Sequence, residues 1–162
     1  MALFHTRSAA VFGIDAHLID VEIDMYPGDA RDIIMVGMPD TAVKESRQRI
    51  KSALANSGFP YPSKCITINL APANLRKEGA GFDLPIALGI LGAMGVVRRC
   101  ESHLMVGELS LDGSLRPVRG ALPIAICARL RAALETWPAY GVAADRRWLE
   151  PLLSMIALAK PA

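Results

Sequence analysis

Several features of secreted, metal-binding and membrane proteins are absent from this sequence of 162 residues. Its three cysteines, Cys65, Cys100 and Cys127, are widely spaced and form no Cys-x-x-Cys pair. Buried thiols are therefore the simpler interpretation, and neither a disulfide framework nor a metal site is expected. The first 20 residues lack a basic segment, an apolar core and a cleavage site, which predicts a cytoplasmic protein. The longest apolar run falls short of the roughly 20 residues that a bilayer needs, so we expect no membrane contact.

Motifs for nucleotide binding and nucleophilic catalysis are also missing. No segment matches GxxxxGK followed by Ser or Thr, and none matches GxGxxG, so nucleotide hydrolysis by this chain alone is not expected. Serine and threonine are absent between Lys77 and Glu101, and lysine is absent between Lys77 and Lys160. A serine activated by a lysine therefore has no place in the central segment. The histidines lie in no triad motif and are predicted to be structural or exposed: His5, His17 and His103. We predict no catalytic, cofactor-binding or metal-ligating residue.

The composition, with 52% hydrophobic and 21% charged residues, is that of a globular protein, and we expect residues 1–162 to form a single domain. The net charge of +2 hides an uneven distribution, because residues 1–40 carry −5 and the remainder carries +7. Solvated faces of opposite sign are the simpler interpretation. A basic surface that meets nucleic acid is the alternative.

The hydrophobic periodicity predicts alternating strands and helices. In the strand from His17 to Met25, for example, every second residue is apolar, while Asp20, Glu22 and Asp24 lie on the other face. Carboxylates two residues apart on a strand are about 7 Å from one another, too far for a compact metal site.

Strands are predicted at 2–12, 17–25, 32–36, 65–70, 103–109 and 115–118, and helices at 41–57, 84–97 and 120–133, with a weaker strand within 135–143 and a weaker helix at 146–158. This order predicts an α+β domain with a mixed sheet packed by helices.

The segment 69–97 is predicted to be the centre of the fold. A strand leads into a Gly-rich loop, and the loop leads into a helix without charge. Asp83 is expected to be its N-cap, with Pro85 in the first turn. Gly89, Gly92 and Gly95 recur every three residues, which permits close approach of other elements to a buried helix.

The loop at 76–81 precedes the amino end of that helix, where free amides and the helix dipole favour anions. It is interpreted either as a structural turn or as a contact site for a partner, a ligand or nucleic acid. In the helix 41–57, Lys44, Glu45, Gln48, Arg49 and Lys51 are predicted to face solvent. The candidate contact residues are Lys44, Arg47, Lys51, Arg76, Lys77, Glu78, Gly79, Gly81, Arg116 and Arg119.

Three strings carry a family resemblance: IIMVGMPDTAVKESRQRIKSALANSGFPYP, ITINLAPANLRKEGAGFDLPIALGIL and VGELSLDGSLRPVRGALPIA. In this order and spacing they resemble the N-terminal domain of the bacterial magnesium-chelatase-like AAA+ ATPases, the ComM/YifB competence-protein family. The resemblance covers about residues 4–128, and the tail at 129–162 fits the family only loosely. It implies a fold like ribosomal protein S5 domain 2, which the proteolytic domain of Lon shares.

In Lon-like proteases the catalytic serine lies in the loop that corresponds to 77–83, and its place here falls near Gly81. The catalytic lysine's place falls near Leu122. No serine lies near Gly81 and no lysine lies near Leu122, so the chain resembles a Lon-type scaffold without Lon chemistry. A residual peptidase is the less favoured alternative.

Full-length members of the family resemble hexameric helicases that drive DNA branch migration during natural transformation. The resemblance therefore implies an accessory domain without catalysis, whose partners are the AAA+ module of its parent protein, further copies and possibly DNA. ATP and Mg are implied only for the full-length family, and no cofactor is predicted for this chain. The family's name does not imply insertion of metal into porphyrin. The chain stops before any ATPase module, as expected either for an isolated domain or for a truncated or split gene, and a protein-interaction domain is the further alternative.

Overall fold

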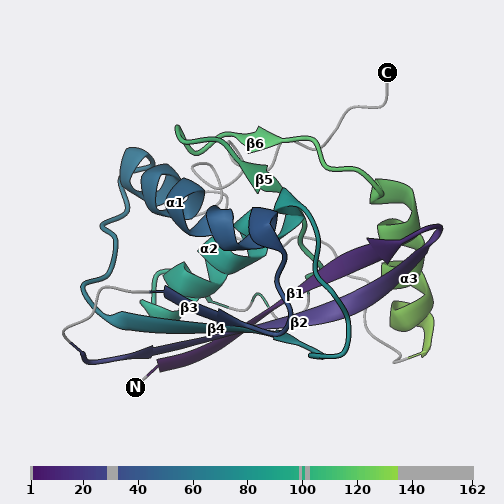
Figure 1. The fold of residues 1–162 in the computed structure, drawn as a ribbon, viewed down its shortest axis with the longest axis horizontal. Coiled ribbons are helices and arrows are strands. Elements are labelled where there is room, and N and C mark those ends of the chain that lie inside the picture. Colours follow the sequence, from purple (N-terminus) through teal and green to yellow (C-terminus); the bar gives the residue numbers. More distant parts are fainter. Residues whose placement is uncertain (1, 29–32, 99, 101–102, 135–162) are drawn as a thin grey trace.

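The computed structural model describes residues 2–28, 33–98, 100 and 103–134 of the chain. Among them, a four-stranded sheet and a two-stranded sheet are combined with three α-helices and one 3-10 helix (Figure 1). The elements are β1 (Ala2–Phe12), β2 (Asp15–Tyr26), β3 (Ile33–Val36), α1 (Thr41–Asn56), β4 (Cys65–Ala71), η1 (Ala80–Phe82), α2 (Asp83–Ala93), β5 (Glu108–Leu109), β6 (Leu115–Arg116) and α3 (Ala121–Leu134). The predicted α+β class with a mixed sheet is confirmed. The elements predicted at 135–143 and 146–158 lie outside the described residues.

The larger sheet has the order β1-β2-β4-β3. The pairs β1–β2 and β2–β4 are antiparallel, whereas β3 pairs with β4 in parallel. The predicted alternation in β2 is confirmed, because Ile19, Val21 and Ile23 are fully buried and Asp20 on the other face has a side chain that is 60% exposed. The sheet therefore buries one face and leaves the other face partly open to water.

Helix α2 lies between the sheet and α1, at the centre of the molecule (Figure 1). Its residues 83–92 are buried, as predicted for this segment. A Cβ atom added at Gly89 would lie 2.6 Å from Cγ1 of Ile23, and one added at Gly92 would lie 2.3 Å from Cε1 of Phe4. The two glycines thus allow α2 to contact β1 and β2 directly, since any side chain there would collide with the sheet.

The helix is shorter than the predicted 84–97. It ends at Ala93, and Gly95 adopts a left-handed backbone conformation with φ of +79°. The Val96 amide donates to the Leu91 carbonyl at 2.9 Å, which closes the helix as a C-terminal glycine commonly does. Gly95 is consequently a terminating residue, and its predicted role on the helix surface is wrong.

The strand predicted at 103–109 is reduced to two residues in β5. Met105 donates its amide to the Arg7 carbonyl at 2.9 Å, so this segment makes only a single bridge along the edge of β1. Gly107 then donates to Gly81 at 2.9 Å and accepts from the Leu84 amide at 3.0 Å. Because the start of α2 takes these backbone groups, the segment cannot continue as a regular strand. In the part of the chain that the structure describes, no helix is long and apolar enough to cross a membrane.

Candidate functional site

Asp83, the first residue of α2, is fully buried, and its carboxylate accepts hydrogen bonds from α1 and β5. Arg49 of α1 donates from Nε to Oδ2 at 2.7 Å and from Nη2 to Oδ1 at 3.0 Å. The Leu109 amide of β5 also donates to Oδ2, at 3.1 Å. The predicted N-cap role of Asp83 is therefore wrong, because η1 leads directly into α2 and Phe82 takes the N-cap position without a side-chain hydrogen bond. The predicted solvated position of Arg49 is also wrong, since only 22% of its side chain is exposed.

Burial and hydrogen bonding act in opposite directions on this pair. Burial raises the pKa of the Asp83 carboxyl, and the hydrogen bonds from Arg49 and Leu109 offset part of that rise. The hydrogen bond to Asp83 raises the pKa of Arg49 in turn. The guanidinium also donates to the Ala42 carbonyl at 3.1 Å. The pair thus fixes the start of α2 against α1 and β5, which sets the position of the loop before α2.

Asp40 holds the same loop from the other side. Its Oδ1 accepts from the Val43 amide at 2.7 Å and caps α1, while its Oδ2 accepts from the Gly79 amide at 3.1 Å. The Asp40 amide donates to the Lys77 carbonyl at 3.0 Å. Sequence reasoning did not single out Asp40, although an aspartate directly before a predicted helix is the usual N-cap signal.

Lys77 was expected at the surface as a contact residue, but it is fully buried. Its Nζ donates to the Pro72 carbonyl, and its amide donates to the Met38 carbonyl at 3.2 Å. Burial lowers the pKa of the Lys77 ammonium. Its side chain therefore stabilises the loop from inside and does not reach a partner, which corrects the expected surface position.

A groove of about 1230 Å³ lies between the tip of the β1–β2 hairpin, the loop 78–82, residues 106–108 and the start of α3. Four of the predicted contact residues line it: Glu78, Gly79, Gly81 and Arg119. None of the described residues that line it carries a hydroxyl, thiol, imidazole or amine in its side chain. The described lining thus offers carboxylates and one guanidinium, but neither the hydroxyl nor the amine that a serine–lysine pair requires.

The groove combines acidic and apolar groups. Asp40, Glu78 and Glu108 contribute carboxylates, while Arg119 contributes the positive charge. Three apolar side chains that line it are strongly exposed: Ile14 by 89%, Leu122 by 72% and Ile126 by 51%. This composition is typical of a binding surface.

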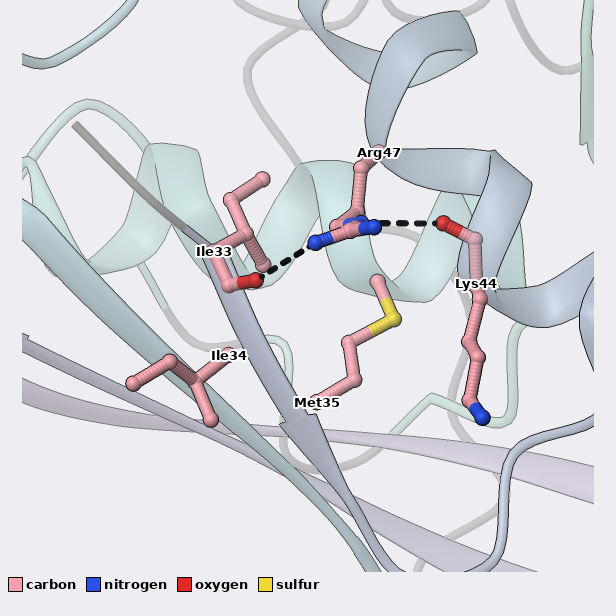
Figure 2. Close-up of a pocket in the computed structure, with 5 residues that line it drawn as sticks. All are labelled: Ile33, Ile34, Met35, Lys44 and Arg47. Carbon is pink, nitrogen blue, oxygen red and sulfur yellow. Dashed lines mark hydrogen bonds between the residues drawn. The ribbon is translucent and has the colours of Figure 1, made fainter.

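Two further predicted residues, Lys44 and Arg47, lie at a different place. They line a smaller hollow of about 370 Å³ beside β3, together with Ile33, Ile34 and Met35 (Figure 2). Arg47 donates from Nη1 to the Ile33 carbonyl and from Nε to the Lys44 carbonyl, both at 3.1 Å.

The remaining predicted residues are exposed but lie on separate elements. Arg76 pairs with Glu78 at 3.1 Å, Arg116 donates to Ser110 Oγ at 2.7 Å, and Lys51 lies over the Tyr61 ring with Nζ 5.9 Å from its centroid. The structure therefore brings Glu78, Gly79 and Gly81 together with Arg119 in one groove. The other predicted basic residues do not line it.

Metal binding finds no support in the described ranges, where no group of three or more His, Cys, Asp or Glu side chains is placed to hold an ion. Two carboxylates of β2 instead interact with side chains of the neighbouring strands. Asn69 of β4 donates to Glu22 at 2.8 Å, and Arg7 of β1 lies 3.6 Å from Asp20. Of the three thiols, Cys100 is buried, while Cys65 and Cys127 are only half-buried, so the expected burial holds for Cys100 alone.

Comparison with known proteins gives matches over most of the chain. YifB of Escherichia coli is 47% identical over 124 residues, which cover 75% of this chain and 24% of YifB. Rv2897c of Mycobacterium tuberculosis is 42% identical over 147 residues, covering 90% of this chain and 28% of the relative. The competence protein ComM of Haemophilus influenzae is 44% identical over 133 residues, covering 80% and 26%. The chain thus spans about a quarter of the length of these relatives.

The family described as subunit ChlI of Mg-chelatase matches residues 21–135. This range contains α1, η1, α2 and the β5–β6 hairpin, which together position the loop 78–82 and most of the groove. On this match, and on its homology to YifB and ComM, the chain belongs to the ChlI family of Mg-chelatase subunits.

Proposed function

We propose that this chain is a non-catalytic accessory domain of a ComM-like AAA+ ATPase, with a role in ATP-driven handling of DNA that an ATPase module supplies. The observation that carries the proposal is the extent of the homology. Between 75% and 90% of the chain aligns with YifB, Rv2897c and ComM, yet it accounts for only 24% to 28% of their length. The remainder of such a protein is where a motor would lie.

The groove supports a role in binding rather than catalysis. The positions that correspond by resemblance to the catalytic serine and lysine of Lon, near Gly81 and Leu122, both line this groove. Their convergence in one site favours a scaffold related to ribosomal protein S5 domain 2. Neither glycine nor leucine supplies a hydroxyl or an amine, and no serine, threonine or lysine is among the described residues that line the groove.

DNA contact is the part of the proposal that rests on charge. Lys51, Arg76 and Arg119 are exposed, and the name of ComM associates that relative with competence. Contacts to phosphates make binding depend on salt, because each one releases condensed counterions. The proposed partners are therefore the ATPase module, further copies of the chain and DNA.

Fluorescence anisotropy with labelled single-stranded and branched DNA tests this part, at about 50 mM and about 200 mM salt. We expect binding at the lower concentration and a loss of about tenfold or more at the higher one. Absence of binding even at low salt would remove DNA from the proposal and leave the protein-interaction role. Cleavage of an unfolded protein substrate by the purified chain would contradict the non-catalytic assignment.

A further inference from the structure

Strand β3 is an open edge of the larger sheet. It pairs with β4 on one side, and within the described part of the chain no strand pairs with its other side. The opposite edge of the sheet differs, because Met105 donates to the Arg7 carbonyl and partly covers β1. An open strand edge presents backbone donors and acceptors that a further extended chain can pair with.

The two faces beside this edge have different chemistry. Ile33 is buried on the helix-covered face, and Met35, two residues on, is on the same side. Ile34 and Val36 lie on the opposite face, where they are 51% and 44% exposed. Met38, just beyond the strand, is 55% exposed. The edge therefore offers an apolar strip on the open face of the sheet.

The helix-covered side of the same edge is cationic. Arg47 points from α1 to Ile33 of β3, and Lys44 lines the same hollow beside Ile33 and Met35 (Figure 2). Both side chains are exposed. The Arg47 guanidinium donates to the Ile33 carbonyl at 3.1 Å, so it covers one acceptor of the open edge while that edge is empty.

We propose that the β3 edge binds an extended peptide segment whose side chains alternate between acidic and apolar. Successive side chains of an added strand point to opposite faces of the sheet. Those on the helix-covered side meet Lys44 and Arg47, which favours carboxylates there. Those on the open face meet Ile34 and Val36, which favours apolar groups. Backbone pairing supplies affinity, and the two rows of side chains supply specificity.

Arg47 takes part in an exchange when the peptide binds. A peptide amide replaces its guanidinium at the Ile33 carbonyl, and a peptide carboxylate accepts the hydrogen bonds that Arg47 then has available. Both groups thus keep a partner in the free and the bound state, so no buried polar group is left unsatisfied.

A second copy of this chain fits the edge less well. Two β3 strands paired edge to edge would bring two sets of Lys44 and Arg47 to the same side of one junction. Like charges placed close together in this way oppose association. Charge complementarity therefore favours an acidic segment of another polypeptide.

The proposal is tested with the capped, fluorescein-labelled hexapeptide Glu-Val-Glu-Val-Glu-Val and its Lys-Val counterpart, by anisotropy. We expect the chain to bind the acidic peptide only. The double variant Lys44→Glu and Arg47→Glu should lower this affinity by about tenfold or more and favour the Lys-Val peptide instead. The double variant Arg116→Glu and Arg129→Glu makes an equal change of charge at exposed positions of β6 and α3. It is the matched control and should leave the affinity unchanged.

Backbone pairing is tested separately. Methylation of alternate peptide amides should abolish binding in one frame and spare it in the other, because only one set of amides faces β3. Hydrogen exchange should slow at residues 33–36 when the peptide is bound. The proposal is overturned by equal affinity for both peptides, by an equal loss in the Arg116→Glu and Arg129→Glu control, or by unchanged exchange in β3. It is also overturned if sedimentation shows a dimer in which exchange at residues 33–36 is slowed without peptide, since a second copy would then occupy the edge.

Discussion

Arg49 and Asp83 lie 34 positions apart in the sequence, yet they form the buried ion pair that positions the loop before α2. We expect Arg49→Met to lower the free energy of unfolding by about 3 kcal/mol at neutral pH, because it leaves the Asp83 carboxylate buried without its cation. Burial then raises the pKa of Asp83 in the folded protein above its value in the unfolded chain. The folded variant consequently binds more protons than its unfolded state. Its loss of stability relative to the wild type should therefore become smaller as the pH falls.

Urea unfolding followed by circular dichroism, at about pH 7 and about pH 5, measures this difference against the wild type. Lys51→Met is the control, because Lys51 is exposed on the same helix. If Arg49→Met lost the same free energy of unfolding at both pH values, the loss would not come from an ionised Asp83 carboxylate without its cation.

The phenol of Tyr61 is expected to make the stability of the folded protein depend on pH in the alkaline range. Burial raises its pKa from 10.0 to about 12, against a smaller opposing effect of Arg47. A phenol whose pKa is raised by folding stabilises the folded state below pH 10 and loses that contribution as the pH rises toward 12. We expect the urea midpoint to fall between about pH 9 and about pH 11 and the Tyr61→Phe variant to lose part of this slope. An identical slope in both proteins would place the titrating group elsewhere.

At the scale of the elements, the contact between α2 and the sheet depends on glycine. Gly92→Ala adds a methyl group 2.3 Å from Cε1 of Phe4 and 2.4 Å from two more atoms of that ring. Overpacking of this kind lowers stability by about 1–3 kcal/mol, whereas the gain in helix propensity is at most about 1 kcal/mol, so most of the range is a net loss. We expect a net loss in thermal and urea unfolding, and partial rescue in the Gly92→Ala and Phe4→Leu double variant. Full stability of Gly92→Ala would show that the Phe4 ring moves aside freely.

At the scale of the whole molecule, the basic residues that the structure describes are spread over several elements and do not form one patch. Lys51 is on α1, Arg76 is in the loop before η1, and Arg116 is on β6. For DNA binding, we therefore expect the Lys51→Glu and Arg76→Glu double variant to weaken affinity uniformly across sequences and to reduce the salt slope by about 2. Arg98→Glu, an exposed change outside the candidate set, is the control. An unchanged slope in the double variant would exclude both side chains from phosphate contact.

The local sequence pattern was sufficient to predict the bounds of elements in which buried residues recur at a regular period. The alternation of β2 and the helical period of α1 depend on neighbours within one element, so the predicted bounds differ from the observed ones by only one or two residues. The two-residue β5 was overpredicted, because the backbone of Gly107 pairs with residues more than 20 positions away.

The sequence by itself determined the α+β order, the buried central helix, the family resemblance and the absence of serine and threonine in the segment before that helix. Only the tertiary structure decided that Lys77 is buried, that Asp83 pairs with Arg49, and that Glu78, Gly79, Gly81 and Arg119 share one groove. The physical reason is that periodicity reports which face of an element avoids water. Ion pairs and groove walls, in contrast, depend on which distant segments meet, and no local pattern encodes that meeting.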